Sequence, residues 1–274
     1  MSDDPLLAAD AVATERGHVL VDCRPDAAAY AAGHLAGAVH AQLERDLSAP
    51  VTDAKHGGRH PLPSIEALCA RLGDWGITPS THVIAYDDQG GANAAARLWW
   101  LLRALGHARV QVVDGGLAAL RAAGHVLTAA LPTPASAPPY PATHYVWPQA
   151  DRVDVDAART DVGRCVLDVR AAPRFRGEAE PIDPIAGHIP GAINVPLSEN
   201  LGPDGRFKAA DALRALYQEA LAGRAPTRLI VHCGSGVTAC HTLLALERAG
   251  LPGAALYVGS WSEWCRNPEL LRSP

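Results

Sequence analysis

The sequence predicts an α/β fold that occurs twice along the chain, each copy with a central, mostly parallel sheet flanked by helices. Two observations support this prediction. Four blocks of sequence recur in the same order in the two halves of the chain. Within each half, short apolar runs rich in β-branched residues alternate with segments of helical periodicity, a pattern typical of a parallel sheet covered on both faces. The 274 residues are enough for two domains at roughly 100–200 residues each.

The recurring blocks keep a nearly constant spacing. Asp22 and Asp168 each end an apolar run in an Asp-x-Arg element, and they lie 146 residues apart. Asp87 and Cys233, which end a later apolar run, are also 146 residues apart. A Gly-His element recurs at an offset of 154, so the second copy has about eight extra residues before it. The paired blocks are residues 18–24 with 165–170, 33–38 with 187–192, 82–87 with 228–233, and 112–117 with 256–261.

A proline-rich stretch separates the two copies. Residues 131–141 contain five prolines, which favours an extended, semi-rigid linker over a helix or a central strand. We therefore predict a first domain at residues 1–130, a linker at 131–145 and a second domain at 146–274.

The second copy shows the expected order of a strand followed by a helix. Residues 229–232 form a short apolar run that predicts a buried strand. A helix is predicted between Gly236 and Gly250, because apolar and small residues recur there at helical spacing. These residues are Thr242, Leu243, Leu246 and Ala249.

Composition excludes several classes of function. Hydrophobic residues make up 48% and charged residues 19% of the chain, with a formal net charge of −5. The acidic balance argues against nucleic acid or an anionic membrane as the main partner. No signal peptide or bilayer-spanning apolar stretch is visible, so we expect a cytoplasmic protein. The six cysteines contain no CxxC pair, and we expect most of them to be reduced.

The segment around Cys233 carries the predicted chemistry. A buried strand ends there, and a loop with Gly234 and Gly236 then leads into a helix. Ligands of open α/β sheets bind beyond the carboxyl ends of the strands. The glycines allow successive backbone N–H groups to point inward as an anion-binding nest, and the helix N-terminus adds its dipole. Such a nest would stabilise a cysteine thiolate and equally the terminal sulfur of a persulfide.

The first copy differs at this position. Asp87 occupies the place of Cys233, and a carboxylate cannot act as a soft nucleophile. We therefore predict that the second copy is catalytic and that the first is a degenerate, inactive copy.

Taken together, the chain resembles the tandem rhodanese-domain sulfurtransferases over essentially its whole length. The motifs that carry the resemblance are Gly-His-Ile-Pro-Gly-Ala at 187–192, the Asp168-x-Arg170 strand end, and Cys-Gly-Ser-Gly-Val-Thr-Ala at 233–239. In that family the cysteine of the C-terminal domain accepts sulfur as a persulfide and passes it to a thiol or to cyanide. The resemblance implies two rhodanese-like domains, catalysis by Cys233, and no cofactor or metal.

The loop also resembles one branch of that family. Members that prefer thiosulfate usually carry basic residues just after the cysteine, whereas the neutral loop seen here is similar to the 3-mercaptopyruvate branch. The resemblance makes Ser235 a catalytic residue. It also makes four loop residues substrate-binding, namely Gly234, Gly236, Val237 and Thr238.

That branch uses a relay of serine, histidine and an acid, which implies two further catalytic residues. The histidine corresponds to His60, and the acid, ten residues after the histidine of the first Gly-His element, corresponds to Glu44. The family has Asp at the acid position, so Asp46 is the alternative partner. Such a relay could pass a proton between His60 and the substrate or thiol by way of Ser235. Judged from the residues alone, His60 would be an exposed loop histidine.

Recognition of a substrate carboxylate calls for arginine. Arg174 matches the first substrate arginine of the branch, but Ile182 stands where a second one is expected. A single arginine could hold the substrate, or Arg59 or Arg97 could supply the second.

A simpler interpretation of the basic residues is also open. Arg174 and Arg176 could form surface ion pairs with Glu178 or Glu180, which contribute little to stability. Both copies keep the Asp-x-Arg element although one has lost the cysteine, so we expect it to be structural. Four tryptophans are expected in the core or at a packing surface, namely Trp99, Trp100, Trp261 and Trp264.

Sulfur transfer from 3-mercaptopyruvate to a thiol such as thioredoxin or glutathione, or to cyanide, is thus the predicted function, with thiosulfate as the alternative donor. A cysteine phosphatase is disfavoured, because that chemistry needs an arginine six residues after the cysteine and Ala239 stands there. A non-enzymatic sulfur carrier would keep the loop but would need neither His60 nor Arg174.

Overall fold

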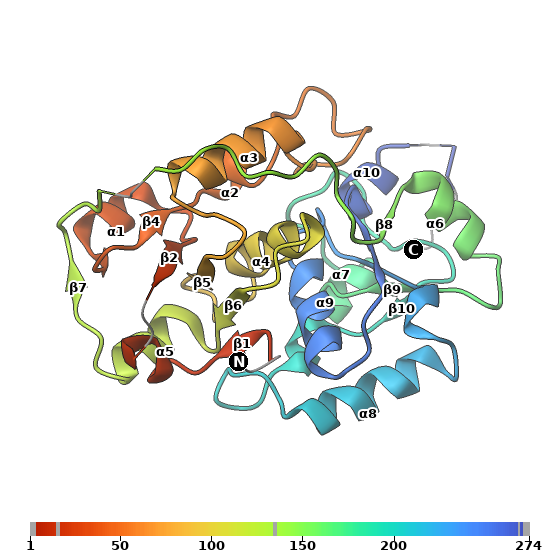
Figure 1. Cartoon of the computed structure of the whole chain (residues 1–274). Helices are drawn as coiled ribbons and strands as arrows, with labels where there is room; N and C mark the ends of the chain where they lie inside the picture. The colour runs from red at the N-terminus through yellow and green to blue at the C-terminus, as the bar shows by residue number, and fades with distance from the viewer. Residues whose placement is uncertain (1–3, 15–16, 134–135, 268, 271–274) are drawn as a thin grey trace. The chain divides into compact units, whose positions relative to one another are not determined.

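The computed structural model describes residues 4–14, 17–133, 136–267 and 269–270, and it divides into two compact units (Figure 1). The first unit consists of Met1–Ala49 and Pro63–Trp147, and the second of Pro50–Leu62 and Pro148–Pro274. Each unit contains one five-stranded sheet, and every pair of neighbouring strands in both sheets is parallel. The predicted α/β fold with two copies is confirmed.

The first unit has the strand order β1-β6-β5-β2-β4, with a small antiparallel pair β3-β7 at its side. Its strands are β1 (Leu6–Leu7), β2 (His18–Asp22), β3 (His34–Leu35), β4 (Val39–His40), β5 (His82–Tyr86), β6 (Val110–Val113) and β7 (Leu127–Thr128). Its helices are η1 (Ala11–Thr14), α1 (Ala27–Ala32), α2 (Leu43–Asp46), α3 (Ile65–Asp74), α4 (Ala94–Ala104) and α5 (Gly116–Ala122).

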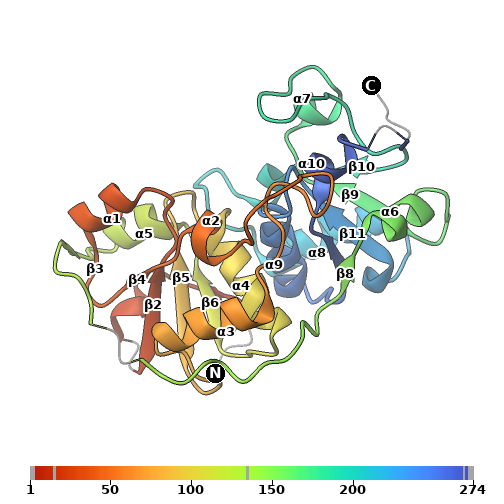
Figure 2. The same cartoon turned by 90° about the horizontal axis from the view of Figure 1, so that it is seen from above.

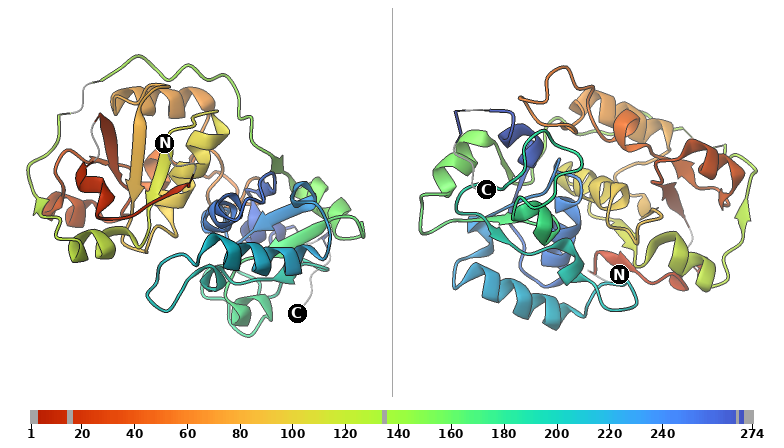
Figure 3. Two further views of the ribbon diagram at one scale, coloured as in Figure 1. Left: turned by 60° about the horizontal axis from the view of Figure 1, so that its bottom comes forward. Right: turned by 180° about the vertical axis from the view of Figure 1, so that it is seen from behind.

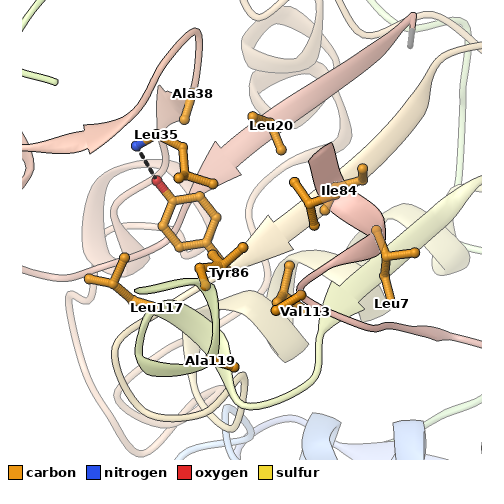
Figure 4. Close-up of a cluster of buried hydrophobic side chains, with 12 residues drawn as sticks. Leu7, Leu20, Leu35, Ala38, Ile84, Tyr86, Val113, Leu117 and Ala119 are labelled. Atoms are coloured by element: carbon orange, nitrogen blue, oxygen red, sulfur yellow. Dashed lines mark hydrogen bonds between the residues drawn. The ribbon is translucent and has the colours of Figure 1, made fainter. Parts of the chain in front are cut away.

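Alternation along these strands sends side chains to both faces of the sheet. Leu20 and Ile84 pack with Leu117 of α5 in a buried cluster that also contains Tyr86 (Figure 4). The opposite face is covered by α4, which packs against β5 and β6. Because both faces are covered, the central strands are mostly apolar, as the continuous runs in the sequence predicted.

The sheet of the second unit has the same order when it is followed from the other edge, β8-β12-β11-β9-β10. Each of its strands therefore has a counterpart in the first unit, with β9 corresponding to β2 and β11 to β5. Its strands are β8 (Gln149–Ala150), β9 (Cys165–Asp168), β10 (Ile193–Asn194), β11 (Leu229–His232) and β12 (Ala255–Tyr257). Its helices are α6 (Arg152–Ala158), α7 (Ala172–Phe175), η2 (Leu197–Asn200), α8 (Ala210–Leu221), η3 (Pro226–Arg228), α9 (Ala239–Arg248) and α10 (Ser260–Trp264). α8 lies beside α9, which packs on β11 and β12 (Figure 3).

The proline-rich stretch is packed against the first unit. It runs along α3 without forming a helix or strand in its described residues (Figure 2). The Tyr140 N–H donates to the Cys69 carbonyl at 2.9 Å, and the Ala137 N–H donates to the Gly73 carbonyl at 2.8 Å. A side chain at Gly73 would meet two backbone carbonyl oxygens at 2.8 Å, so glycine permits this close approach.

The division into units differs from the expected boundaries in two respects. Residues 131–147 belong to the first unit rather than to a separate linker, because they are hydrogen-bonded to it. Residues 50–62 belong to the second unit although they precede α3 of the first. The predicted first domain, residues 1–130, is therefore interrupted by a segment that packs with the second unit.

A buried ion pair closes the corresponding strand end in both units. Arg24 binds Asp22 at 2.6 Å, and Arg170 binds Asp168 at 2.6 Å. Each guanidinium also donates to the carbonyl of the Gly-His glycine, at 2.7 and 2.8 Å. All four side chains are at least 95% buried. The bonds that the two pairs share support the structural role expected from their retention in both copies.

Breaking one of these pairs is expected to destabilise the second unit. Asp168→Asn removes the closer of the two carboxylates that compensate the buried Arg170, the other being Glu180 at 3.3 Å. Loss of one partner of a buried pair costs about 3–5 kcal/mol, and this is the upper limit of the expected effect. Thermal and urea unfolding measure the change. Arg176→Gln is the matched control, because the Arg176–Glu178 pair is exposed, and it should leave the unfolding midpoint unchanged. Equal effects of the two substitutions would contradict this account.

Candidate active site

Cys233 lies directly after β11, at the carboxyl edge of the sheet in the second unit, and is 1% exposed. Its N–H donates to the Ser260 hydroxyl at 3.2 Å, and its carbonyl accepts from the Trp261 N–H at 3.1 Å. These two bonds fix the cysteine backbone against the beginning of α10. The loop then runs to Thr238, and α9 begins at Ala239.

The loop between Cys233 and α9 leaves backbone donors available. Gly236 has a φ of +74°, and a Cβ there would lie 2.4 Å from the Val258 carbonyl oxygen, so a side chain is excluded. Among the described residues no acceptor is hydrogen-bonded to the loop amides of Gly234, Ser235, Val237 and Thr238. Such a run of free amides at the start of a helix is suited to an anion.

In the first unit a carboxylate of the chain itself occupies the corresponding loop. The Asp87 carboxylate accepts four backbone N–H bonds at 2.7–3.2 Å. Burial raises the pKa of Asp87, and the four N–H bonds oppose that rise. The donors are Gln89, Gly91, Asn93 and Ala95. The nest that Asp87 occupies in the first unit is thus left to Cys233 and its ligands in the second.

Ser235 and His60 are brought together within the second unit. The His60 Nδ1 lies 2.8 Å from the Ser235 hydroxyl oxygen. His60 is half-buried and Ser235 is 7% exposed. The interpretation of His60 as an exposed loop histidine is therefore wrong. The two side chains form a hydrogen-bonded pair beside the cysteine loop.

His60 is held by the way residues 50–62 attach to α10. The Gly57 N–H donates to Glu263 Oε1 at 3.0 Å, and the Arg59 N–H donates to the Ser262 hydroxyl at 3.1 Å. Gly58 between them has a φ of +73°, and a Cβ there would lie 2.4 Å from the Gly259 carbonyl oxygen. This backbone contact is possible only for glycine.

Two arginines lie over the cysteine loop. Arg174, on α7, and Arg59 both approach Gly234, at 3.6 and 3.3 Å from the position that its Cβ would occupy. Arg59 is one of the two alternatives that the sequence offered for a second arginine. The other, Arg97, is fully buried in α4 of the first unit.

The simpler interpretation of the arginines holds for one of them. Arg176 forms an exposed pair with Glu178 at 2.6 Å. Arg174 also forms an ion pair, with Glu180 at 2.6 Å, but it faces the cysteine loop as well. Ile182 is 54% exposed.

Glu44 and Asp46, the two candidates for the acid of the relay, lie on α2 of the first unit. Glu44 is exposed, whereas Asp46 is buried. The Asp46 carboxylate accepts from Arg45 at 2.7 Å, from Arg71 at 3.0 Å and from the Gln42 N–H at 2.8 Å. The pairing of either acid with His60 stays a prediction.

The remaining cysteines and tryptophans belong to the core. All six cysteines are free thiols, and all are buried. The four tryptophans singled out in the sequence are at most 1% exposed, as expected for core residues. In the described residues no group of three or more His, Cys, Asp or Glu side chains could hold a metal ion, and no helix has the length and apolarity to cross a membrane.

Comparison with known proteins decides the family. The model of the rhodanese-like domain matches the chain twice, at residues 7–123 and 151–267. The chain belongs to the tandem rhodanese-domain sulfurtransferases. It is 45% identical to a Pseudomonas aeruginosa protein named "Probable 3-mercaptopyruvate sulfurtransferase", covering 98% of this chain and 97% of the relative.

The names of further relatives include both sulfur donors, thiosulfate and 3-mercaptopyruvate. A thiosulfate sulfurtransferase of Gallus gallus is 35% identical, covering 84% of this chain and 78% of the relative. Among solved structures, a 3-mercaptopyruvate sulfurtransferase from Leishmania major superposes with a TM-score of 0.84 at 28% identity, covering 98% of this chain and 76% of that one. The rhodanese-domain chain described here is accordingly a sulfurtransferase enzyme.

The attachment of residues 50–62 is expected to be required for activity. Gly58→Ala would force the segment away from Gly259 and displace His60, and a shift of about 1 Å in a positioning element can cost about 100-fold. We expect the sulfurtransferase kcat/KM to fall at least about tenfold.

Gly205→Ala is the control for this substitution. Gly205 has a φ of +74°, and a Cβ there would meet nothing within 4 Å, so it introduces the same backbone strain without the collision. Equal kcat/KM values for the two folded variants would show that the contact with α10 does not matter.

Proposed function

We propose that this sulfurtransferase moves sulfur from 3-mercaptopyruvate to a thiol acceptor through a persulfide on Cys233. The observation that carries the proposal is the 2.8 Å hydrogen bond between Ser235 and His60 beside the cysteine loop. A hydroxyl linked to an imidazole is a proton relay, and 3-mercaptopyruvate is a donor whose leaving group must gain a proton.

The first half of the reaction forms the persulfide. The Cys233 thiolate attacks the donor sulfur, so that an S–S bond forms and the C–S bond of the donor breaks. The electron pair of that bond remains on carbon as the enolate of pyruvate. Ser235 and His60 transfer the proton of the donor thiol to this carbon, and pyruvate leaves. The free amides of the loop stabilise the negative terminal sulfur of the persulfide.

The second half returns the enzyme to its starting state. A thiol acceptor, as its thiolate, attacks the terminal sulfur, and Cys233 leaves as thiolate. Thioredoxin, glutathione and cyanide all have the nucleophilicity that this step needs. We propose Glu44 as the acid that orients His60 in the relay. The six free thiols agree with the reducing conditions of the cytoplasm, the proposed location.

Thiosulfate is the second candidate donor, and one observation favours it. Arg59 and Arg174 bring two positive charges to within 3.6 Å of the position that a Gly234 Cβ would occupy, and a compact dianion would be attracted there. Sulfite, however, leaves thiosulfate without needing a proton, so the pair formed by Ser235 and His60 would have no task in that reaction.

Substitution of Cys233 and Ser235 should separate the two donors. Cys233→Ser should abolish turnover of both. Ser235→Ala should lower kcat/KM for 3-mercaptopyruvate by about 100-fold, in the range of general acid–base catalysis, and leave kcat/KM for thiosulfate unchanged. Steady-state kinetics with each donor and a common thiol acceptor measure these values.

Two results would contradict the proposal. Undiminished turnover in Cys233→Ser would refute the persulfide mechanism. Faster turnover of thiosulfate than of 3-mercaptopyruvate, combined with an unchanged kcat/KM for 3-mercaptopyruvate in Ser235→Ala, would assign thiosulfate as the donor.

A further inference from the structure

We propose that a cavity in the second unit binds a small organic cation that carries two ammonium groups. The cavity has a volume of about 450 Å³, which is in the range of small-molecule sites. It lies where β8 leads into α6 and where β12 leads into α10, and all of its described lining residues belong to the second unit. The cysteine loop, His60, Arg59 and Arg174 do not line it, so a ligand there is independent of the identity of the sulfur donor.

Three carboxylates line this cavity, and among the described residues no basic side chain does. Asp151 and Asp154 lie at the beginning of α6, and Glu263 lies on α10. None of the three forms an ion pair with a described residue. Arg152, the basic residue next to Asp151, is bound to Glu269 at 2.6 Å. The cavity therefore carries uncompensated negative charge, which favours a cation.

The bonds that the two aspartates already make leave part of each carboxylate available. Asp151 and Asp154 form a capping box, in which each carboxylate accepts one backbone N–H, at 2.8 and 3.1 Å. This accounts for the two aspartates as helix caps. Each of them still keeps one carboxylate oxygen without a hydrogen-bond donor in the described part of the chain. Those oxygens can accept N–H bonds from a cation at the cavity.

A buried hydroxyl on the cavity wall is the second observation that indicates a ligand. The Tyr257 side chain is fully buried, and its hydroxyl makes no hydrogen bond of standard geometry to any residue that the structure describes. Burial and the nearby Glu263 carboxylate raise the pKa of this hydroxyl. Buried polar groups are normally hydrogen-bonded, so Tyr257 calls for a partner from outside the chain. An ammonium group has three N–H donors and can serve the hydroxyl and Glu263 together.

The arrangement of the acids favours an organic cation over a metal ion. In the described residues no group of three or more His, Cys, Asp or Glu side chains could hold a metal ion, so these carboxylates do not converge on one point. Much of the remaining wall is apolar, including Pro61, Leu62 and Val258, and suits methylene groups. A short alkyl chain with an ammonium group at each end matches the acid of α10 and the two acids of α6.

Calorimetric titration with 1,4-diaminobutane at low ionic strength tests the site. We expect one molecule to bind to each chain, and added salt should weaken binding, because Asp151 and Asp154 are exposed and exposed charges are screened. 1,4-Butanediol has the same chain without the charges and should not bind. No binding of the diamine, or equal binding of the diol, would overturn the proposal.

Two substitutions inside the cavity test the predicted contacts. Tyr257→Phe should weaken diamine binding about tenfold or more, the value of a hydrogen bond to a charged group. It should unfold at or above the wild-type temperature, because the hydroxyl has no well-formed hydrogen bond to lose. Glu263→Gln keeps an oxygen that can accept the Gly57 N–H but removes the charge, and it should cause a similar loss of affinity. Unchanged affinity in both folded variants would overturn the site.

A matched pair of aspartates separates this cavity from the general charge of the protein. Asp154 and Asp211 are both exposed acids in the first turn of a helix of the second unit, but only Asp154 lines the cavity. Asp154→Asn should weaken diamine binding about two- to fivefold, the range of an exposed ion pair. Asp211→Asn should leave it unchanged. Equal losses would show that the diamine responds only to net charge and would overturn the proposal.

A lysine derivative distinguishes a free diamine from a side chain of a partner protein. Nα-acetyllysine amide carries one ammonium group on its alkyl chain, so it cannot place a second charge at the aspartates and should bind more weakly than the diamine. Tighter binding of the lysine derivative would overturn the choice of a free diamine and assign the cavity to a lysine of a partner protein.

Discussion

The structure depends on one constraint at the carboxyl edge of each sheet. A strand ends, and a glycine-containing loop turns into a helix so that several backbone N–H groups lack partners of their own. Buried amides need an acceptor. The first unit supplies it from within, as the Asp87 carboxylate that accepts four N–H bonds. The second unit has Cys233 there, and no described residue accepts the N–H groups of Gly234, Ser235, Val237 and Thr238.

The same loop thus surrounds a carboxylate in the first unit and a cysteine in the second. Residues near the loop also differ between the two units. Ser260 has a φ of +54°, the conformation that Gly116 adopts in the first unit with a φ of +56°. A non-glycine residue there costs about 1–3 kcal/mol. The serine hydroxyl accepts the N–H of Cys233 and donates to the Tyr257 carbonyl at 2.8 Å. Backbone strain at Ser260 is offset by bonds that hold the cysteine in place.

The sequence alone predicts whatever is local or repeated. The strands, the helix after Cys233 and the correspondence of Asp87 to Cys233 follow from residues close together in the chain or from the constant offset between copies. The attachment of residues 50–62 to the second unit does not, because Gly57 and Glu263 are 206 residues apart and no periodicity marks the segment. Arg59 could be singled out only as a candidate beside His60. In the structure it binds the buried carboxylate of Asp183 at 3.1 Å. Sequence reasoning missed Asp183, since a lone aspartate in a proline-rich loop carries no signal of burial.

Intact-protein mass spectrometry after treatment with 3-mercaptopyruvate tests the central claim most directly. All six cysteines are free thiols, so any of them could in principle accept sulfur, but of the six only Cys233 lies directly before the loop whose amides form the nest. The account predicts that the wild type gains one sulfur atom, that peptide mapping places it on Cys233, and that Cys233→Ser gains none. Sulfur on another cysteine, or an equal gain in Cys233→Ser, would contradict it.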